Sequence, residues 1–379
     1  MLLSIVIPTK GRTLYVKEVL NLLLSIGLNN TEICIQDNNE IDEISGEYSK
    51  EISIGKIKYN HTYQPLSFVD NFEKAIQLAT GDYITIIGDD DIVNPNIETV
   101  IKEIMMDYEF DVLIPSSRSL FYIWPDTYSL SKSKKLKEGK GLLIKRSFSS
   151  KLTRIDNNEE VKSFFKNGCL DYLDTNMPKL YHGIVKRTLI MEIINKYGFI
   201  FGGLTPDIYA AVMLSLHAKS VYKIDMPLTI PGACKKSGSA ASETGAHTGK
   251  YEDAPHLRFR GKYDWSCDVP KIYTVETIWA DSALAALRST DFDVNVNLKN
   301  LHLLLSIKYG ELYHSVPDDY KITYTDMILY KINYVYKKKT IWYGKKILEK
   351  IGLIPTSYIE IEKLENIANI AKSLPVELK

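Results

Sequence analysis

The chain has 379 residues, of which 45% are hydrophobic and 25% are charged, as in folded globular proteins. Lys plus Arg and Asp plus Glu each number 47, so no overall charge attracts the protein to nucleic acid or to an anionic membrane. The four cysteines form no CxxC pair, which argues against a structural zinc site and a disulfide framework. No apolar run approaches the roughly 20 residues that span a bilayer, and residues 1–8 lack the basic flank of a signal peptide. We therefore expect a cytoplasmic protein with no nucleic-acid partner.

Strand-like and helix-like segments alternate through the first 106 residues. The strand-like segments are 2–7, 32–36, 56–63 and 83–87, and the helix-like segments are 14–25, 67–79 and 96–106. This alternation predicts an α/β fold built on a doubly wound sheet with helices on both faces. In such sheets ligands bind beyond the carboxyl ends of the strands. The polar residues at 9–12 and 88–91, which follow two strand-like segments, are therefore the first candidates for chemistry.

The rest of the chain divides into regions of different pattern. Residues 116–175 lose the alternation and include a Lys-rich run at 131–140, which predicts a partly mobile insertion. The α/β pattern returns at 183–224, so we expect one domain over residues 1–230. A Gly-rich stretch then opens a flexible active-site loop or linker, 231–269. Helical periodicity predicts a helical C-terminal region, 270–379, with helices near 301–307, 327–336 and 341–351.

Three consecutive aspartates, Asp89, Asp90 and Asp91, follow the strand-like segment 83–87. Like charges this close repel one another unless a cation or a proton intervenes. Carboxylate oxygens suit Mg²⁺ or Mn²⁺, and such ions commonly bridge carboxylates to a diphosphate. A solvated acidic turn before the next helix explains the triplet equally well, so the residues alone leave both interpretations open.

Three motifs occur in a specific order: SIVIPTKGR at 4–12, IQDNN at 35–39 and NFEKAIQLATGDYITIIGDDDI at 71–92. This order resembles that of inverting family-two glycosyltransferases with the GT-A fold. The resemblance covers residues 1–115 well and 181–242 loosely. It implies transfer of a sugar from a nucleotide-diphosphate-sugar donor, with a UDP-sugar as the first choice. The implied acceptor is a hydroxyl on a glycan or lipid-linked chain, such as a bacterial capsule or teichoic acid.

The resemblance also assigns roles to single residues. It places Pro8 and Thr9 at the base and ribose pocket, Arg12 beside the nucleotide, Asp37 on the base and Asn71 facing the donor. Each has a simpler explanation. Pro8 could end a strand, Thr9 could cap a helix, and Arg12 could be a solvated residue at a helix start. Asp37 could be an acid in a turn and Asn71 a polar residue of a helix.

Gly88 stands where many family members have the first aspartate of an Asp-x-Asp-Asp motif. The metal ligands are therefore ambiguous. We expect Asp91 to bind Mn²⁺ or Mg²⁺, Asp90 to bind the ribose or the metal, and Asp89 to be structural. The cation would stabilise the departing nucleoside diphosphate.

An inverting transfer needs a base that takes the proton of the attacking hydroxyl. The candidate is Asp207, in the motif GGLTPDIY at 202–209. Family members have an acidic pair at this helix start, and here only the second acid is kept. Helix capping also accounts for the motif, with Thr205 as the N-cap, Pro206 in the first turn and Asp207 favoured by the helix dipole. The two roles are compatible.

Three further features have two interpretations each. Lys235 and Lys236 either close over the diphosphate or belong to a solvated loop. His247 is either a third metal ligand or a surface residue, whereas His182 is expected to be a core or hydrogen-bonding residue. The basic and aromatic stretch at 330–346 either lies peripherally on the inner face of the cell membrane or packs in a helical or homo-oligomer contact.

Two other functions remain open at this stage. Metal-dependent nucleotidyl transfer uses a similar domain, although residues 9–12 are only a weak version of its Gly-rich loop. A non-catalytic scaffold with a degenerate domain is the other alternative, because two family acids are missing. A dinucleotide-binding oxidoreductase is disfavoured because no GxGxxG motif follows the first strand.

Overall fold

The protein is built around one large mixed sheet. The computed structural model describes residues 1–116, 119–130, 140–237, 248–310, 313, 320, 322–333 and 359–370. The sheet has eight strands in the order β3-β2-β1-β4-β10-β6-β11-β9. These are β1 (Leu3–Thr9), β2 (Thr31–Asp37), β3 (Ile57–His61), β4 (Tyr83–Ile86), β6 (Val112–Pro115), β9 (Leu152–Ile155), β10 (Ile184–Lys186) and β11 (Val221–Ile224).

The strand order reverses at β1. From β1 the chain moves outward through β2 and β3, then returns to place β4 on the other side of β1, and these four strands are parallel. Strand β10 is antiparallel to both β4 and β6. A reversal of this kind opens a crevice at the carboxyl ends of the two central strands. The polar segments after β1 and β4 are therefore brought to one edge of the sheet.

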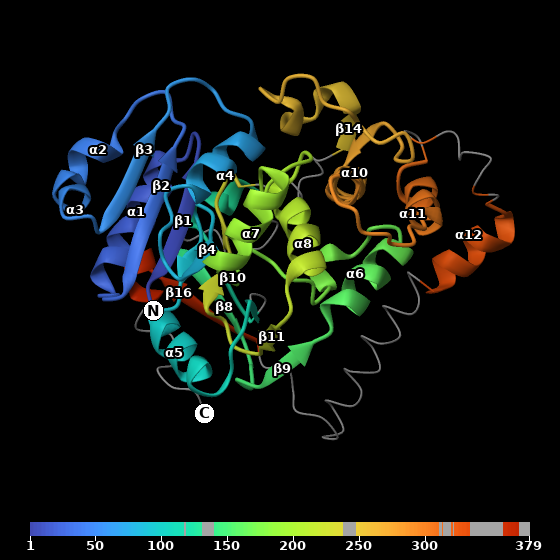
Figure 1. The fold of residues 1–379 in the computed structure, drawn as a ribbon. Helices are drawn as coiled ribbons and strands as arrows, with labels where there is room; N and C mark the ends of the chain where they lie inside the picture. The colour runs from blue at the N-terminus through green and yellow to red at the C-terminus, as the bar shows by residue number, and fades with distance from the viewer. Residues whose placement is uncertain are drawn as a thin grey trace.

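Helices cover both faces of the sheet, as the sequence predicted (Figure 1). The helices are α1 (Thr13–Ser25), α2 (Ile44–Glu47), α3 (Ser49–Ser53), α4 (Phe68–Ile76), α5 (Ile97–Asp107), α6 (Asn157–Lys166), α7 (Arg187–Tyr197), α8 (Pro206–His217), α10 (Val275–Arg288), α11 (Lys299–Lys308) and α12 (Tyr324–Lys331). Successive residues of β1 point to opposite faces. Ile5 and Ile7 pack with α1 and α5, and Val6 packs with α4 and α8. The doubly wound α/β fold is confirmed.

Residues 116–175, predicted as an insertion, form regular elements on either side of the undescribed stretch 131–139. Strands β7 (Leu120–Ile123) and β8 (Gly141–Arg146) form a hairpin within a second sheet of order β13-β7-β8-β16, and β9 joins the edge of the main sheet. The predicted Lys-rich mobile run lies almost entirely in that undescribed stretch. The sequence missed these strands because their partners, such as β11, lie far away along the chain.

The C-terminal region carries the predicted helical appendage, and it also returns to the N-terminal domain. Helices α10, α11 and α12 lie side by side at one end of the molecule (Figure 1). Strand β16 (Ile359–Leu364), which the sequence did not indicate, pairs antiparallel with β8 along its whole length. The helix predicted at 341–351 lies outside the described residues, and the divisions at residues 230 and 270 stay predictions.

Short strands complete the architecture between these parts. Strand β5 (Ile92–Val93) pairs with β12 (Thr229–Ile230), and β13 (Gly232–Ala233) pairs with β7. Strand β14 (Thr248–Lys250) pairs with β15 (Ile272–Thr274). The 3₁₀ helices include η1 (Pro125–Leu130), η3 (Tyr172–Asp174), η4 (Tyr251–Asp253), η5 (Pro255–Leu257) and η8 (Ile367–Asn369). The first two of these strand pairs bring residues 229–233 directly beside the aspartate triplet.

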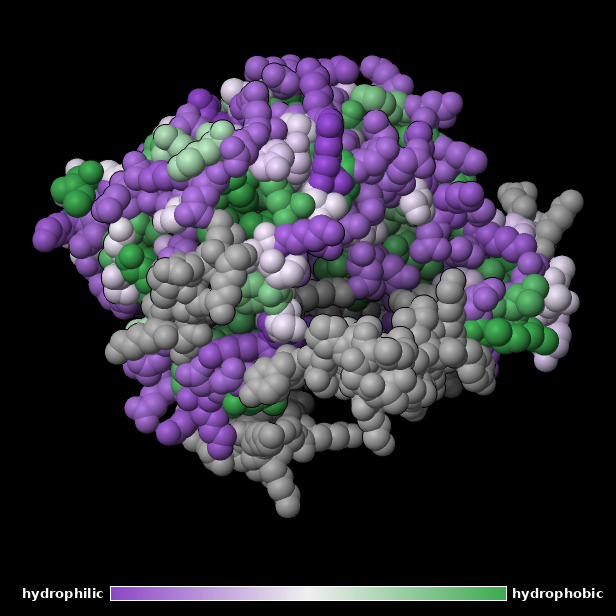
Figure 2. Space-filling view, turned by 90° about the horizontal axis from the view of Figure 1, so that it is seen from below, coloured by the Kyte–Doolittle hydropathy of each residue, from purple (hydrophilic) through white to green (hydrophobic). Residues whose placement is uncertain are grey.

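The surface seen from below the view of Figure 1 is mostly hydrophilic (Figure 2). Hydrophobic residues gather at the right edge of that view, where Figure 1 places α12. Exposed apolar side chains of this segment include Ile328, Leu329 and Ile332. Over the described part of the chain, no helix combines the length and apolarity that crossing a bilayer requires.

Candidate active site

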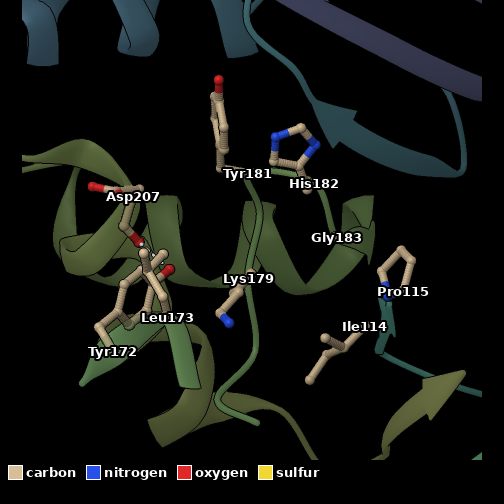
Figure 3. Close-up of a pocket in the computed structure, with 9 residues that line it drawn as sticks. All are labelled: Ile114, Pro115, Tyr172, Leu173, Lys179, Tyr181, His182, Gly183 and Asp207. Atoms are coloured by element: carbon tan, nitrogen blue, oxygen red, sulfur yellow. Dashed lines mark hydrogen bonds between the residues drawn. The ribbon is translucent and has the colours of Figure 1, made fainter. Parts of the chain in front are cut away.

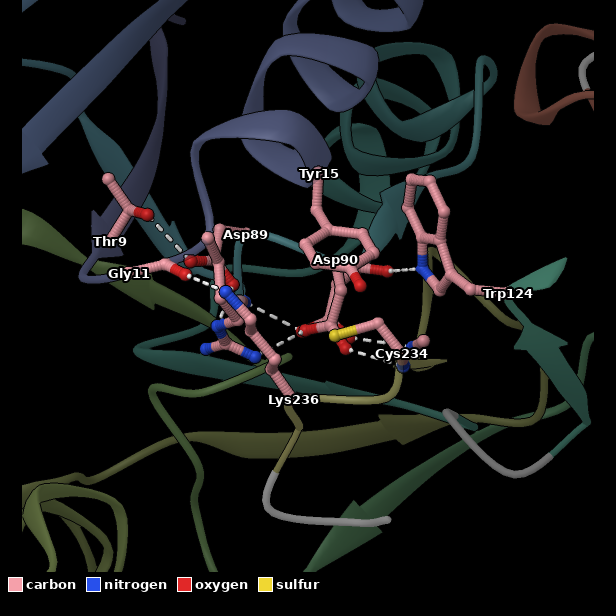
Figure 4. Close-up of polar contacts among 12 residues, drawn as sticks. Thr9, Gly11, Tyr15, Asp89, Asp90, Trp124, Cys234 and Lys236 are labelled. Carbon is pink, nitrogen blue, oxygen red and sulfur yellow. Dashed lines mark hydrogen bonds and ion pairs between the residues drawn. The ribbon is translucent and has the colours of Figure 1, made fainter. Parts of the chain in front are cut away.

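Asp89 and Asp90 lie just beyond β4 and face residues that follow β1 (Figure 4). The Thr9 hydroxyl donates to Asp89 Oδ2 at 2.6 Å, and Arg12 Nε lies 2.8 Å from Asp89 Oδ1. Arg12 Nη1 lies 3.2 Å from Asp90 Oδ1, and the backbone N–H of Cys234 donates to Asp90 Oδ2 at 3.1 Å. The two carboxylates are thus buried and share one guanidinium.

Asp91 turns away from Arg12 and is held from the other side. The backbone N–H of Gly232 donates to Asp91 Oδ1 at 2.7 Å. Asp91 Oδ2 accepts from the Gly88 N–H at 2.6 Å and from the Tyr181 hydroxyl at 2.8 Å, with His182 Nε2 at 3.3 Å. His182 Nδ1 also lies 3.0 Å from the Thr229 hydroxyl. The interpretation of His182 as a hydrogen-bonding residue is therefore confirmed.

The three aspartates differ in the direction of their pKa shifts. Burial, only partly offset by Arg12, raises the pKa of Asp89 above its ordinary value. Burial and the neighbouring charge of Asp91 raise the pKa of Asp90 to about 7. Burial acts in the same direction on Asp91, but the His182 ring and the two backbone donors outweigh it and lower the pKa of Asp91. Although burial disfavours the charged guanidinium, Asp89 and Asp90 raise the pKa of Arg12.

A cleft of about 370 Å³ lies between the strand tips and the C-terminal helices. Its lining includes Pro8, Arg12 and Gly88, which lie at or just after the ends of β1 and β4. It also includes the start of α8 and a set of apolar and aromatic groups. Those groups are Phe68, Phe72, Leu173, Tyr181, His256, Val275, Ile278 and Trp279. The geometry brings the predicted donor residues Pro8 and Arg12 into one cleft with Asp207.

Asp207 stands in the first turn of α8, at the junction of this cleft with a smaller cavity of about 90 Å³ (Figure 3). The smaller cavity is also lined by Tyr172, Lys179 and Tyr181. Burial raises the pKa of Asp207, while backbone N–H groups and Lys179 act in the opposite direction. A raised pKa makes the ionised carboxylate a stronger base. The position and chemistry of Asp207 therefore suit proton removal from a group bound in the cleft.

Thr205 occupies the N-cap position of α8, but its side chain makes no capping hydrogen bond. The Thr205 hydroxyl is buried, lines the cleft beside Asp207, and has no hydrogen-bond partner in the described part of the chain. An unpartnered buried hydroxyl costs free energy unless a bound group satisfies it. Thr205 therefore stands at the N-cap position of α8 without acting as a side-chain cap.

Asp37 and Asn71 lie next to Thr9 but outside the described cleft lining. Asp37 pairs with Thr9 in the sheet register and is buried, with Oδ2 accepting from the Tyr59 hydroxyl at 2.9 Å. Asn71 Nδ2 donates to the Thr9 carbonyl at 3.4 Å, and the buried Asn71 Oδ1 has no partner among the described residues. Their roles in donor binding stay predictions.

The loop after β12 folds over the turn that follows β1. Lys236 Nζ donates to the Gly11 carbonyl at 3.1 Å (Figure 4), and the Lys235 backbone N–H donates to Asp126 at 3.3 Å. Both lysines are exposed. The loop thus lies close to Arg12, although nothing tests whether either lysine contacts a diphosphate. His247 lies outside the described residues.

The sequence interpretation missed several residues that form the site. Trp124 donates from Nε1 to the Asp90 carbonyl at 2.8 Å, and it stacks edge-on against Tyr15, whose hydroxyl donates to Asp126. Cys234 is fully buried against Asp90. The only sequence signal for the missed residue Tyr181 was its place just before a predicted strand. The others belong to segments that looked irregular, so no local pattern could have found them.

The three carboxylates do not fit a divalent cation as the structure places them. Five of the six carboxylate oxygens accept a hydrogen bond from the protein. The sixth, Asp89 Oδ1, makes no hydrogen bond but lies 2.8 Å from Arg12 Nε, so a guanidinium already stands between Asp89 and Asp90. Among the described residues, no group of three or more His, Cys, Asp or Glu side chains is placed to hold a metal.

The N-terminal half of the site lies in a recognisable sequence family. Residues 4–159 match the family model described as Glycosyl transferase family 2. The resemblance to family-two glycosyltransferases is thus confirmed over residues 4–159. This range includes Pro8, Arg12 and the aspartate triplet, whereas Asp207 and the 231–237 loop lie beyond it. No curated protein matches the chain.

The solved structures to which the chain is similar include those of S. aureus TarS. TarS 1–349 in complex with UDP-GlcNAc is 12% identical over 68% of this chain and 65% of that chain, with a TM-score of 0.45. TarS 1–349 in complex with UDP is 13% identical over 62% of this chain and 61% of that one, with a TM-score of 0.43. A further structure of TarS is 13% identical over 62% of this chain and 37% of that chain, with a TM-score of 0.42. The chain spans less than two thirds of each of these proteins, and similarity at this level says nothing about substrates.

Proposed function

We propose that the protein transfers a sugar from a nucleotide-diphosphate-sugar donor to a hydroxyl of an acceptor, with inversion at the anomeric carbon. One observation carries this proposal. A single cleft is lined by Pro8 and Arg12, which lie within the residues that match the family-two model, and by the candidate base Asp207. A donor on the strand-tip side and an acceptor on the α8 side would meet in this cleft.

The proposed reaction is a single displacement. The acceptor oxygen forms a bond to the anomeric carbon while the bond from that carbon to the diphosphate oxygen breaks. The acceptor proton moves to the Asp207 carboxylate, and the nucleoside diphosphate leaves. Arg12 lines the cleft and has guanidinium N–H groups beyond the two that face Asp89 and Asp90, so it would bind the diphosphate.

The acceptor side of the cleft is mainly apolar and aromatic. Phe72, Ile278 and Trp279 form much of its wall, and Thr205 supplies a buried hydroxyl next to Asp207. Apolar walls with a few placed polar groups are typical of small-molecule sites. They suit a sugar ring, which presents apolar C–H faces and a rim of hydroxyls. We therefore propose a glycan or lipid-linked acceptor, as expected in bacterial surface polysaccharide synthesis.

Several finer parts of the proposal rest on the sequence alone. These are a UDP-sugar as the donor, a cytoplasmic location at the inner face of the membrane, and contact with a membrane or a second copy through the C-terminal helices. Dependence on Mn²⁺ or Mg²⁺, which the sequence predicted, is left out of the proposal because the carboxylates as placed do not fit a divalent cation. No step of the proposed reaction depends on a cation.

Product analysis tests the proposed reaction. The purified protein is incubated with nucleotide-sugars labelled in the β-phosphate, with water or simple glycosides as acceptors. We expect release of the nucleoside diphosphate from at least one donor, and loss of that release in the Asp207→Asn variant. A parallel incubation contains nucleoside triphosphates and sugar 1-phosphates, and release of pyrophosphate there would instead identify nucleotidyl transfer. If no donor binds or reacts, the scaffold interpretation replaces the proposal.

A further inference from the structure

The aspartate triplet contains its own counter-ion. We propose that the Arg12 guanidinium takes the place of a divalent cation at the strand tips, so that the donor diphosphate binds without Mn²⁺ or Mg²⁺. The part of this inference that concerns the donor rests on the proposed function. The part that concerns metal binding rests only on the carboxylates and their partners.

The geometry around Arg12 is that of a buried ion pair. Its side chain is 23% exposed, whereas Asp89 is 0% and Asp90 is 5% exposed at the side chain. Nε faces Asp89 at 2.8 Å and Nη1 faces Asp90 at 3.2 Å, so one planar group bridges two neighbouring carboxylates. A divalent ion bridging Asp89 and Asp90 would face the same two oxygens. The arginine and the cation therefore compete for one position.

The two oxygens of Asp91 accept hydrogen bonds from buried protein groups, and losing those hydrogen bonds would cost free energy. Asp91 is 2% exposed and receives two backbone N–H groups, from Gly88 and Gly232, besides the Tyr181 hydroxyl. Opening Asp91 to a cation would leave those buried donors without partners, at about 1–3 kcal/mol for each. With His182 beside it, Asp91 also has a basic partner of its own. Each of the three carboxylates is thus paired with a basic side chain.

Gly88 removes the position from which a further metal ligand would come. A Cβ at residue 88 would lie 2.6 Å from Tyr181 Oη and 2.9 Å from Asp91 Oδ2. A side chain at residue 88 would have to displace the Tyr181 hydroxyl or the Asp91 carboxylate. The missing family acid and the Arg12 bridge therefore agree: the strand tip has no carboxylate at residue 88 and holds a fixed positive charge between Asp89 and Asp90.

Arg12 is also placed to act on the donor. Two of its five N–H groups face the aspartates, and the side chain lines the cleft. Lys236, from the loop after β12, contacts the turn that carries Arg12, with Nζ 3.1 Å from the Gly11 carbonyl (Figure 4). The diphosphate would therefore meet cationic N–H donors at the position where other enzymes place a metal.

Direct metal binding tests the inference without any substrate. Electron paramagnetic resonance of free Mn²⁺ is recorded with the wild type, Arg12→Met, Arg12→Lys and the control Lys162→Met. Lys162 is an exposed residue of α6 that pairs with Glu159. We expect no Mn²⁺ binding at micromolar concentrations in the wild type, Arg12→Lys and the control, and binding in Arg12→Met. Micromolar binding by the wild type would overturn the inference, and that result does not depend on whether a variant folds.

Nucleoside diphosphate binding in EDTA and in Mn²⁺ tests the role of Arg12 toward the donor. We expect the wild-type affinity to be the same in both buffers. Arg12→Met should lose roughly tenfold or more in EDTA and regain affinity in Mn²⁺. Wild-type binding that requires Mn²⁺ would contradict the inference. If the wild type binds no nucleoside diphosphate in either buffer, the proposed function fails, and the Mn²⁺ spectra still decide the metal part.

Discussion

Gly88 is the residue at which the strand tip departs from the family pattern, and its surroundings explain why a glycine stands there. The backbone N–H of Gly88 holds Asp91, and its missing side chain leaves room for the Tyr181 hydroxyl. The same hydroxyl donates to Asp91. Gly88, Tyr181 and Asp91 therefore form one interdependent contact.

The Gly88→Ala substitution should destabilise the protein by about 1–3 kcal/mol, because the added methyl group overlaps Tyr181 Oη. Tyr181→Phe removes that oxygen. We therefore expect the double variant to be more stable than the sum of the two single effects, by at least about 0.5 kcal/mol. Urea unfolding of the four proteins measures this coupling. Strictly additive effects would show that the predicted overlap is absent.

The Asp207→Asn substitution should lower turnover by roughly 10²–10⁴-fold while leaving donor affinity unchanged, because general-base catalysis contributes about that much. In the wild type, turnover should fall as the pH drops through the raised pKa of Asp207, since only the ionised carboxylate accepts a proton. Steady-state rates of nucleoside diphosphate release check both effects. Glu159→Gln, which removes an acid from the first turn of α6, is the control. Unchanged turnover in folded Asp207→Asn would remove Asp207 from the mechanism.

The site could be predicted from the sequence only where its residues lie in local motifs. The motifs at 4–12 and 71–92 pointed to Arg12 and the aspartates, and the helix start pointed to Asp207. The contact between Arg12 and Asp89 joins residues 77 positions apart. Whether a carboxylate faces a metal, a backbone N–H or a guanidinium depends on such long-range contacts, which one sequence does not reveal.

At the scale of the elements, helix α10 carries a buried acid of its own. Thr274 and Thr277 form a capping box at its start, and Asp281 lies fully buried within it. Asp281 accepts hydrogen bonds from the Tyr263 hydroxyl and from the Ser266 backbone N–H. Burial raises the pKa of Asp281 to about 6. The helix is thereby anchored to the segment that precedes it.

The raised pKa of Asp281 predicts a pH dependence of stability. The folded protein holds this proton more tightly than the unfolded chain, whose value is 3.8, so the stabilisation is present below pH 3.8 and is lost as the pH rises through 6. At about 1.4 kcal/mol per pKa unit, the loss is about 3 kcal/mol. Asp281→Asn keeps both hydrogen bonds if the tyrosine hydroxyl accepts instead of donating.

We therefore expect Asp281→Asn to gain stability relative to the wild type between pH 4 and pH 7. Urea unfolding at several pH values measures the difference, with Asp253→Asn, at an exposed position, as the control. A stability difference that does not change with pH would show that Asp281 does not titrate in this range.

The elements themselves were predictable where hydrophobic periodicity is strong. Helix α8 begins at the helix start predicted around Asp207, and β1 and β4 lie where the apolar runs indicated. Strand β9 escaped prediction because pairing with β11 fixes it and its own residues alternate weakly. Strand β16, which pairs with β8, was missed although its first four residues alternate between isoleucine and glutamate. Pairing partners distant in sequence are set by the whole fold and not by local pattern.

At the scale of the whole molecule, the C-terminal segment closes back onto the N-terminal domain. Strand β16 extends the second sheet beside β8, and η8 packs against α1. Leu364, Ile367 and Ile370 are buried in the same core as α1 and α5. The C-terminal region is thus part of the structure that supports the strand tips, besides carrying the helical appendage.

The Ile370→Ala substitution should lower the free energy of unfolding by about 2–5 kcal/mol, because Ile370 is fully buried and truncation leaves a cavity. Ile361→Ala in β16 is the matched control, since that side chain is 44% exposed, and it should cost less than about 1 kcal/mol. Urea unfolding distinguishes the two. Equal effects would mean that the terminal segment does not pack on the N-terminal core as described.

Calorimetric titration of the wild type with UDP and the other nucleoside diphosphates tests the central claim most directly. The cleft between Arg12 and Asp207 predicts saturable binding of at least one of them to one site, retained in Asp207→Asn. A hundredfold excess over the dissociation constant should then stabilise the fold by about 2.7 kcal/mol. If none of the nucleoside diphosphates binds the folded protein, in EDTA or in Mn²⁺, the cleft is not a donor site and the transferase account is contradicted.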